Sequence, residues 1–214
     1  MSRKKVLIQS DFSLLKTGFA KNAKIILSYL YQTGKYDIVH YCCGLSEKHP
    51  ELSRTPWKSI GCLPSSRKKI QEIEKDPTIN KIAAYGAYYL DNVIEAEKPD
   101  VYIAIQDIWG VDFATKRKWF NKITSAIWTT LDSLPILPTA IETAKKVKNY
   151  WVWSNFATKE LNKIGYENVQ TLHGALEDKD FFPLSKQEKL SLRKKNGISE
   201  KDFVRMSAHG EYHA

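Results

Sequence analysis

Short apolar runs alternate with amphipathic segments along most of the chain. The first run, over 6–8, passes directly into polar residues at 9–11, which is typical of a buried strand. Apolar positions at helical spacing then cover 20–32 and end at Gly34, before a second run rich in β-branched and aromatic residues over 37–43. A strand, a helix and a strand in this order predict a right-handed parallel crossover.

The same alternation continues as far as residue 172. Pro99 closes a long helix whose apolar residues share one face, and Pro138 is placed to open another helix. Repeated strand–helix units predict an α/β fold with a Rossmann-like, doubly wound, mostly parallel sheet and helices on both faces. Further strands are expected over 57–63, 101–105, 125–130, 150–153 and 169–172, with helices over 79–97, 112–122, 139–147 and 156–164.

After residue 176 the pattern changes. An acidic, aromatic loop over 177–183 leads to a strongly basic helix over 185–196, and Gly197 ends that helix. Residues 202–206 are predicted to begin a new strand. We therefore expect a Rossmann-like N-terminal domain over 1–197 and the start of a second domain over 198–214.

Composition narrows the class of protein. Hydrophobic residues make up 43% of the 214 residues, which is enough for a packed core and excludes disorder. A net charge of +9 favours an anionic partner, but the basic runs at 67–69, 116–118 and 193–195 are dispersed and predict solvated helix faces. A specific nucleic-acid platform is therefore not expected.

Neither a membrane span nor an export signal is expected, because no apolar run approaches the required length of about 20 residues. Cys42, Cys43 and Cys62 lack the spacing of a disulfide framework or a zinc site, so they predict buried thiols in a reducing compartment. We expect a cytoplasmic protein whose contact with a membrane, if any, is peripheral.

Small or polar residues follow almost every predicted strand. In an open parallel sheet, ligands bind at the carboxyl ends of the strands, where helix N-termini point. The same residue types also cap helices, so each single position is open to either role. The set comprises Asp11 with the Gly18 loop, Cys43-Gly44, Gln106-Asp107, Asp132-Ser133, Ser154-Asn155 and His173-Gly174. It outlines one cleft, which we expect Asp11, Gly18, Asp107, Asp132 and Ser154 to line.

Several familiar motifs are missing from the sequence. Gly18, expected to be the turn residue of a loop over 12–18, is the only glycine between residues 11 and 20, so there is no dinucleotide fingerprint. A P-loop and a nucleophile elbow are also absent, which disfavours NTPases and serine hydrolases. Asp178-Lys179-Asp180 and the pair His209 and His213 resemble fragments of metal sites, but a charged loop and a chain end explain them better. We expect no metal and no other cofactor.

The order of motifs after residue 150 is more informative. A strand ends at Ser154, a short helix follows, and the next strand leads to His173-Gly174. Phe-Phe-Pro at 181–183 then precedes the basic helix that ends in Gly197-Ile198. This arrangement resembles the end of the N-terminal domain in GT-B glycosyltransferases of the family 4 type, and the opening strand, loop and helix around Gly18-Phe19-Ala20 are similar as well.

The resemblance implies transfer of a sugar from a nucleotide-sugar donor to an unknown acceptor, with retention at the sugar. It implies catalytic roles for Asp132 and His173, the latter in fixing a loop near the domain junction. Ala175-Leu176 replace the usual Val-Asp, and Thr130-Leu131 stand where many relatives carry a histidine before the aspartate. Contacts to the donor or substrate are implied for Asp11, Thr17, Gly18, Phe19, Asp107, Ser154 and Gly174.

The resemblance further implies that 1–197 is the acceptor-side domain and that 198–214 begins a donor-binding domain. This chain alone is then expected to be inactive and prone to self-association through its last strand. Two alternatives stay open: a non-catalytic Rossmann-like module that binds a nucleotide or another anion, and a basic protein associated with nucleic acid.

Overall fold

The computed structural model describes residues 3–177 and 182–203, and the chain falls into two compact units, Met1–Ala175 and Leu176–Ala214. The Asp178–Asp180 pattern and the pair His209 and His213 lie outside the described residues. Most of the strand expected over 202–206 also lies outside them. The domain border expected after residue 197 stays a prediction.

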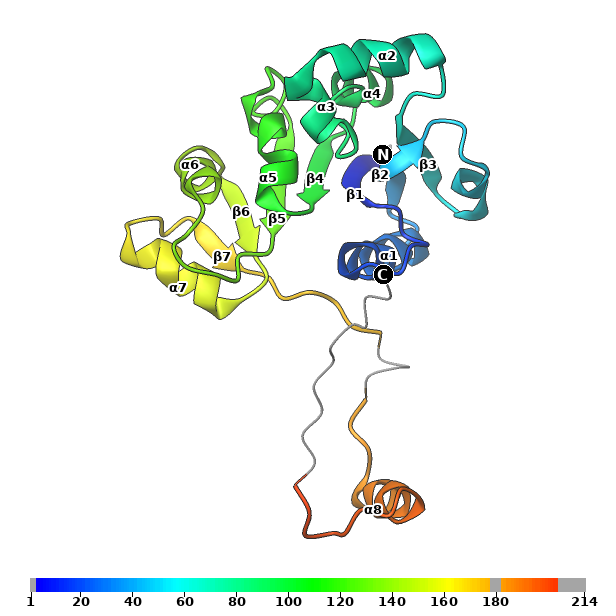
Figure 1. The fold of residues 1–214 in the computed structure, drawn as a ribbon, viewed down its shortest axis with the longest axis vertical. Helices are drawn as coiled ribbons and strands as arrows, with labels where there is room; N and C mark the ends of the chain where they lie inside the picture. Colours follow the sequence, from blue (N-terminus) through cyan, green and yellow to red (C-terminus); the bar gives the residue numbers. More distant parts are fainter. Residues whose placement is uncertain (1–2, 178–181, 204–214) are drawn as a thin grey trace. The chain divides into compact units, whose positions relative to one another are not determined.

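The first unit is built on a seven-stranded sheet in which every described pairing is parallel (Figure 1). The strand order is β3-β2-β1-β4-β5-β6-β7, so successive strands first run to one side of β1 and then, from β4 onward, to the other. This is the doubly wound order predicted from the sequence, and its switch point lies between β1 and β4. The strands are β1 (Lys4–Asp11), β2 (Tyr36–Ser46), β3 (Lys58–Leu63), β4 (Val101–Ile105), β5 (Thr124–Thr129), β6 (Asn149–Val152) and β7 (Val169–Thr171).

Helices occupy most of the connections between these strands. The α-helices of the first unit are α1 (Gly18–Gln32), α2 (Arg67–Lys75), α3 (Pro77–Ala83), α4 (Leu90–Glu97), α5 (Ile108–Val111), α6 (Pro138–Lys146) and α7 (Asn155–Lys163). Two short 3₁₀ helices, η1 (Pro50–Arg54) and η2 (Asp112–Lys116), complete it. The sequence analysis did not predict α2 or η1.

Alternate side chains of the strands belong to two apolar clusters, one on each face of the sheet. On one face, Ile8 and Trp128 belong to a cluster with Ala23 and Leu27 of α1. On the other face, strand residues such as Tyr102 belong to a larger cluster that includes residues of α4, α5, α6 and α7. The strands are therefore buried on both sides, which explains why they read as nearly continuous apolar runs.

The long helix predicted over 79–97 is wrong, because turns interrupt it between α3 and α4. Gly86 adopts a left-handed φ of 97°, and the hydroxyl of Tyr41 donates a hydrogen bond of 2.8 Å to its carbonyl. The side-chain amide of Gln9 donates to the carbonyl of Tyr85. Groups on β1 and β2 thus bind carbonyls that a continuous helix would use internally.

The helix predicted over 112–122 is also wrong beyond its first turn. The chain forms α5 and η2 and then continues in turns as far as residue 123. Arg117 donates a hydrogen bond of 3.3 Å to the carbonyl of Ala87, and the indole of Trp119 donates one of 2.7 Å to Asp91. Contacts with the segment before and within α4 therefore shape these residues.

In the second unit, α8 (Lys186–Lys195) confirms the basic helix predicted over 185–196. A capping box between Ser185 and Glu188 begins it, with each side chain binding the other residue's backbone N–H. The guanidinium of Arg193 donates to the carbonyls of Ser199 and Asp202 and so fixes the turn after the helix. Within 3–177 and 182–203, no helix combines the length and apolar character needed to cross a bilayer.

Candidate functional site

Asp11, at the carboxyl end of β1, joins three elements at the switch point of the sheet. Its Oδ2 accepts a hydrogen bond of 2.5 Å from the hydroxyl of Thr17, the residue that caps α1. Its Oδ1 accepts one of 2.6 Å from the side-chain amide of Gln106, just beyond β4. We call Asp11, Thr17 and Gln106 the Asp11 clasp. Both carboxylate oxygens are engaged, so this group holds β1, α1 and β4 together.

A buried histidine lies next to the clasp and contacts the residue before Asp11. Nε2 of His40, on β2, lies 3.0 Å from the hydroxyl of Ser10, the residue before Asp11. The ring of Phe12 stacks on that of His40 with centroids 6.2 Å apart. Burial lowers the pKa of His40 to about 3, against the opposing effect of a backbone hydrogen bond with Asp11, so the ring is neutral near pH 7.

The N-terminus of α1 opens next to the clasp. The hydroxyl of Thr17 accepts a hydrogen bond of 3.1 Å from the backbone N–H of Ala20, while Thr17 and Gly18 are exposed and Phe19 is half-buried. Gly18 is the first helical residue rather than a loop residue, and a Cβ added to it would meet no heavy atom within 4 Å. The protein's own packing therefore does not require a glycine there, and the helix end faces open space.

A second polar group lies one strand further along the same edge. The hydroxyl of Thr130 donates a hydrogen bond of 2.9 Å to Oδ1 of Asp107, whose side chain is half-buried. Asp132 is exposed, and no hydrogen bond or ion pair joins its carboxylate to another part of the described chain. We call Asp107, Thr130 and Asp132 the β4–β5 crevice. Its carboxylates can accept a hydrogen bond or a proton from a bound hydroxyl group.

A small pocket of about 110 Å³ occupies this crevice. Its lining is mixed: Asp107, Thr130, Asp132 and Ser133 are polar, and Ile108, Trp109, Leu131 and Leu137 are apolar. Binding sites for drug-sized ligands usually measure about 300–1,000 Å³. This pocket therefore has room for a single ring or a similar group, not for a whole nucleotide-sugar.

Ser154 and His173, at the ends of β6 and β7, have structural partners. Ser154 caps α7, because its hydroxyl accepts a hydrogen bond of 3.3 Å from the N–H of Ala157. Nδ1 of His173 lies 2.9 Å from the carbonyl of Trp153. His173 is thereby held against the neighbouring strand, in a geometry that positions the segment leaving β7.

The segment that follows β7 contacts α1. The N–H of Ala175 donates a hydrogen bond of 2.7 Å to the side chain of Asn22, which is buried in α1. A Cβ on Gly174 would lie 3.3 Å from the indole ring of Trp153, so a glycine suits this close approach. Gly174 is thus brought near α1, although β7 is four strands away from β1 in the sheet.

The residues predicted from the sequence therefore form separate groups along one edge. Asp11 and Thr17 belong to the clasp, and Asp107 and Asp132 to the crevice. Sequence analysis placed Gln106 among the residues at the strand ends, but it did not select Asn22, Trp109 or Leu137. The roles of these three residues depend on contacts between distant segments.

In the part of the chain that the structure describes, no group of three or more His, Cys, Asp and Glu side chains is arranged to hold a metal ion. The thiols of Cys42, Cys43 and Cys62 are buried and free, and burial raises the pKa of Cys62 to about 11. A neutral, buried thiol is a weak nucleophile, so we assign these cysteines no chemistry.

No protein-family model and no curated protein matches the chain. Among solved structures, it is similar to Arabidopsis thaliana UGT89C1 complexed with UDP, with a TM-score of 0.49 and 11% identity over 91% of this chain and 55% of that chain. It is also similar to UDP-GlcNAc 2-epimerase from Methanocaldococcus jannaschii, with a TM-score of 0.43 and 15% identity over 81% of this chain and 46% of that chain. The chain thus spans about half the length of these proteins. Likenesses at these scores and identities establish neither a family nor an activity.

Proposed function

We propose that this chain supplies the acceptor side of an enzyme that transfers a sugar from a nucleotide-sugar donor to an acceptor hydroxyl. The observation that carries the proposal is the carboxyl edge of the sheet, which holds both an open helix N-terminus after β1 and a carboxylate without a hydrogen-bond partner in the described chain after β5. Thr17 and Gly18 mark the first feature, and Asp132 marks the second. The order of motifs over 150–198 supports the same assignment.

The N-terminus of α1 is suited to the anionic part of the donor. Backbone N–H groups and the helix dipole favour negative charge at such an end. Gly18 adds no side chain that would keep a phosphate from the backbone, and its neighbourhood is empty to 4 Å. We therefore place the diphosphate of the donor near Thr17, Gly18 and Phe19.

The β4–β5 crevice is suited to the acceptor. In the transfer step, the bond between the sugar and the diphosphate breaks, a bond between the sugar and the acceptor oxygen forms, and the proton of the acceptor hydroxyl passes to the departing diphosphate. Positive charge develops on the sugar as the diphosphate leaves. The carboxylate of Asp132 orients the acceptor hydroxyl and offsets this charge, while Thr130 holds Asp107 in place beside it. Retention at the sugar is part of the proposal, and so is a positioning role for His173.

The test is a screen of the gene product that contains these residues. The protein is incubated with a panel of nucleotide-sugars and a metabolite extract of the source cells, and mass spectrometry follows the released nucleoside diphosphate and any new glycoside. We expect one donor to be consumed only when extract is present, with the anomeric configuration of the sugar retained in the product. Glu95→Gln, a change at an exposed position of α4, is the control and should leave the rate unchanged.

Two outcomes would contradict the proposal. Donor binding without consumption of any donor would favour a non-catalytic nucleotide-binding module. Consumption of the donor to free sugar, with no glycoside formed in any extract, would show a hydrolase instead.

A further inference from the structure

Most of the large exposed apolar side chains of the first unit lie in the segments that follow the strands. Large apolar residues more than one-third exposed occur after β1, β4, β5, β6 and β7. An exposed apolar patch at a binding edge marks a surface for an apolar ligand or partner. These residues are Leu14, Leu15, Trp109, Leu134, Leu137, Phe156 and Leu172.

Two of them line the pocket of the β4–β5 crevice. Trp109 and Leu137 have 45% and 42% of their surfaces exposed, and Leu134, which is 59% exposed, follows the lining residue Ser133 in the chain. The lining also includes two carboxylates, those of Asp107 and Asp132. A ligand that satisfies both parts must have an apolar body and a hydrogen-bond donor at one end.

One edge of the Trp109 environment is provided by the ring of Tyr85. The Trp109 ring meets that of Tyr85 edge-on, with centroids 4.9 Å apart and planes at 79°. The next residue is Gly110, where an added Cβ would lie 2.8 Å from the Tyr85 ring, so the backbone of α5 packs tightly against Tyr85. An exposed indole that packs against Tyr85 offers an aromatic ligand a surface at little cost in conformational entropy.

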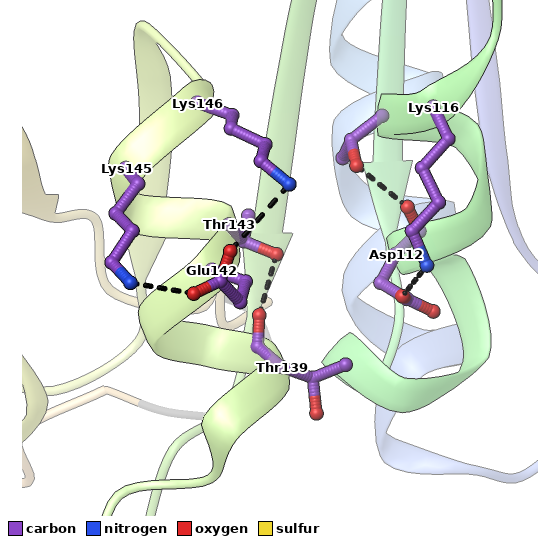
Figure 2. A network of polar contacts seen from close by, with 8 residues as sticks. Asp112, Lys116, Thr139, Glu142, Thr143, Lys145 and Lys146 are labelled. Atoms are coloured by element: carbon purple, nitrogen blue, oxygen red, sulfur yellow. Dashed lines mark hydrogen bonds and ion pairs between the residues drawn. The ribbon is translucent and has the colours of Figure 1, made fainter.

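The local charges disfavour an anionic ligand. The basic side chains of the two elements beyond the pocket walls, η2 and α6, are paired within their own elements, as Figure 2 shows. Lys116 lies 2.8 Å from Asp112, and Lys145 and Lys146 lie 2.6 and 3.5 Å from Glu142. The carboxylates of Asp107 and Asp132 are therefore not offset by these cations, and they would repel a phosphate or a carboxylate.

We propose that the β4–β5 crevice binds an uncharged aromatic alcohol. This inference rests on the proposed function, because the alcohol would be the acceptor of the sugar. The pocket of about 110 Å³ is close to a cavity of about 150 Å³ that accepts benzene, so it suits one aromatic ring. One ring contacts Trp109 and Leu137, and the hydroxyl donates to the carboxylate of Asp132. A second fused ring, as in 2-naphthol, lies outside the pocket, towards Leu134.

The experiment is a titration of the purified 214-residue chain with 2-naphthol, followed by calorimetry and by ¹⁹F NMR of protein labelled with 5-fluorotryptophan. Loss of one resonance in Trp109→Phe assigns the signal of that residue. We expect 2-naphthol to shift this signal and to bind at least about tenfold more tightly than 2-naphthyl phosphate, which has the same ring system with an anionic end. Naphthalene, which lacks the hydroxyl, should also bind more weakly.

Variants locate the site. Trp109→Ala should weaken 2-naphthol binding about tenfold, and Leu134→Ser, a change at an exposed position, should weaken it about threefold without affecting folding. Ile164→Ser removes an equally exposed apolar side chain at the end of α7 and serves as the control, for which we expect no change.

Three results would overturn the proposal. They are equal binding of 2-naphthyl phosphate, tighter binding of 1-decanol than of 2-naphthol, and sedimentation with phosphatidylcholine vesicles that depends on Leu134 while neither alcohol binds. The last two would indicate a lipid alcohol and a membrane surface, respectively. No donor is present in the titration, so a failure of sugar transfer in the enzymatic screen would leave its result unaffected.

Discussion

The Asp11 clasp and the β4–β5 crevice lie along the same edge of the sheet, yet Asp11 and Asp132 differ in how their carboxylates are bound. Both oxygens of Asp11 accept hydrogen bonds, from Thr17 and Gln106, and join three elements. Asp132 is exposed and has no hydrogen-bond or ion-pair partner elsewhere in the described chain. An aspartate at the end of a strand is therefore not by itself a sign of ligand binding. Its hydrogen bonds distinguish a structural carboxylate from one that is available to a substrate.

The largest expected difference is in stability. Asp11→Ala removes the acceptor for two side chains, and we expect it to lower the free energy of unfolding by about 2–3 kcal/mol. Asp132→Ala breaks no contact and should change it by less than about 0.5 kcal/mol. Urea unfolding followed by circular dichroism measures both values, and equal losses in the two variants would remove the distinction between clasp and crevice.

We expect acid to lower the free energy of unfolding through His40, the buried histidine next to the clasp. The pKa of His40 is lowered from 6.5 to about 3 by burial, so below pH 6.5 the unfolded chain binds a proton that the folded chain does not. Stability is therefore expected to rise with pH between about 3 and 6.5. From pH 7 to pH 5 this single group should cost about 2 kcal/mol, measurable as a fall in the urea midpoint.

His40→Phe keeps an aromatic ring against Phe12 and should reduce this pH dependence. His49→Gln, at an exposed position, is the matched control and should retain it. If the two variants lose stability in acid to the same extent, His40 is not the titrating group.

Gly110 and Gly18 allow the same comparison between a packed and an open position to be made for the backbone. We expect Gly110→Ala to cost about 1–2 kcal/mol, because the new Cβ would lie 2.8 Å from the ring of Tyr85. Gly18→Ala should cost less than about 0.5 kcal/mol, because its Cβ would meet nothing within 4 Å. Differential scanning calorimetry would show this contrast, and a large loss for Gly18→Ala would mean that the α1 end is not open.

Most of the architecture was predictable from the sequence, because parallel strands buried on both faces leave nearly continuous apolar runs. The helix predicted over 79–97 failed for a non-local reason. Its apolar spacing is helical, but Gly86 receives the hydroxyl of Tyr41 on its carbonyl and a Cβ there would lie 2.4 Å from the Tyr41 ring. Local periodicity contains no information about such a contact across 45 residues.

The site was predictable in outline only. Topology places the ends of β1, β4 and β5 side by side, so the proximity of Asp11, Asp107 and Asp132 follows from the strand order. The strand order does not predict which carboxylate accepts hydrogen bonds, because Gln106 and Thr130 are separated from their partners by 95 and 23 residues in the sequence. The exposure of Trp109 likewise depends on its packing against Tyr85.

The most direct test of the account compares transfer rate and stability in Asp132→Asn, made in the gene product that contains these residues. The change keeps the shape of the side chain and removes its charge. We predict that kcat/KM falls about 100-fold while the urea midpoint stays at the wild-type value, and that Glu95→Gln changes neither. An Asp132→Asn enzyme with wild-type kcat/KM would contradict the assignment of the β4–β5 crevice as the place where the acceptor reacts.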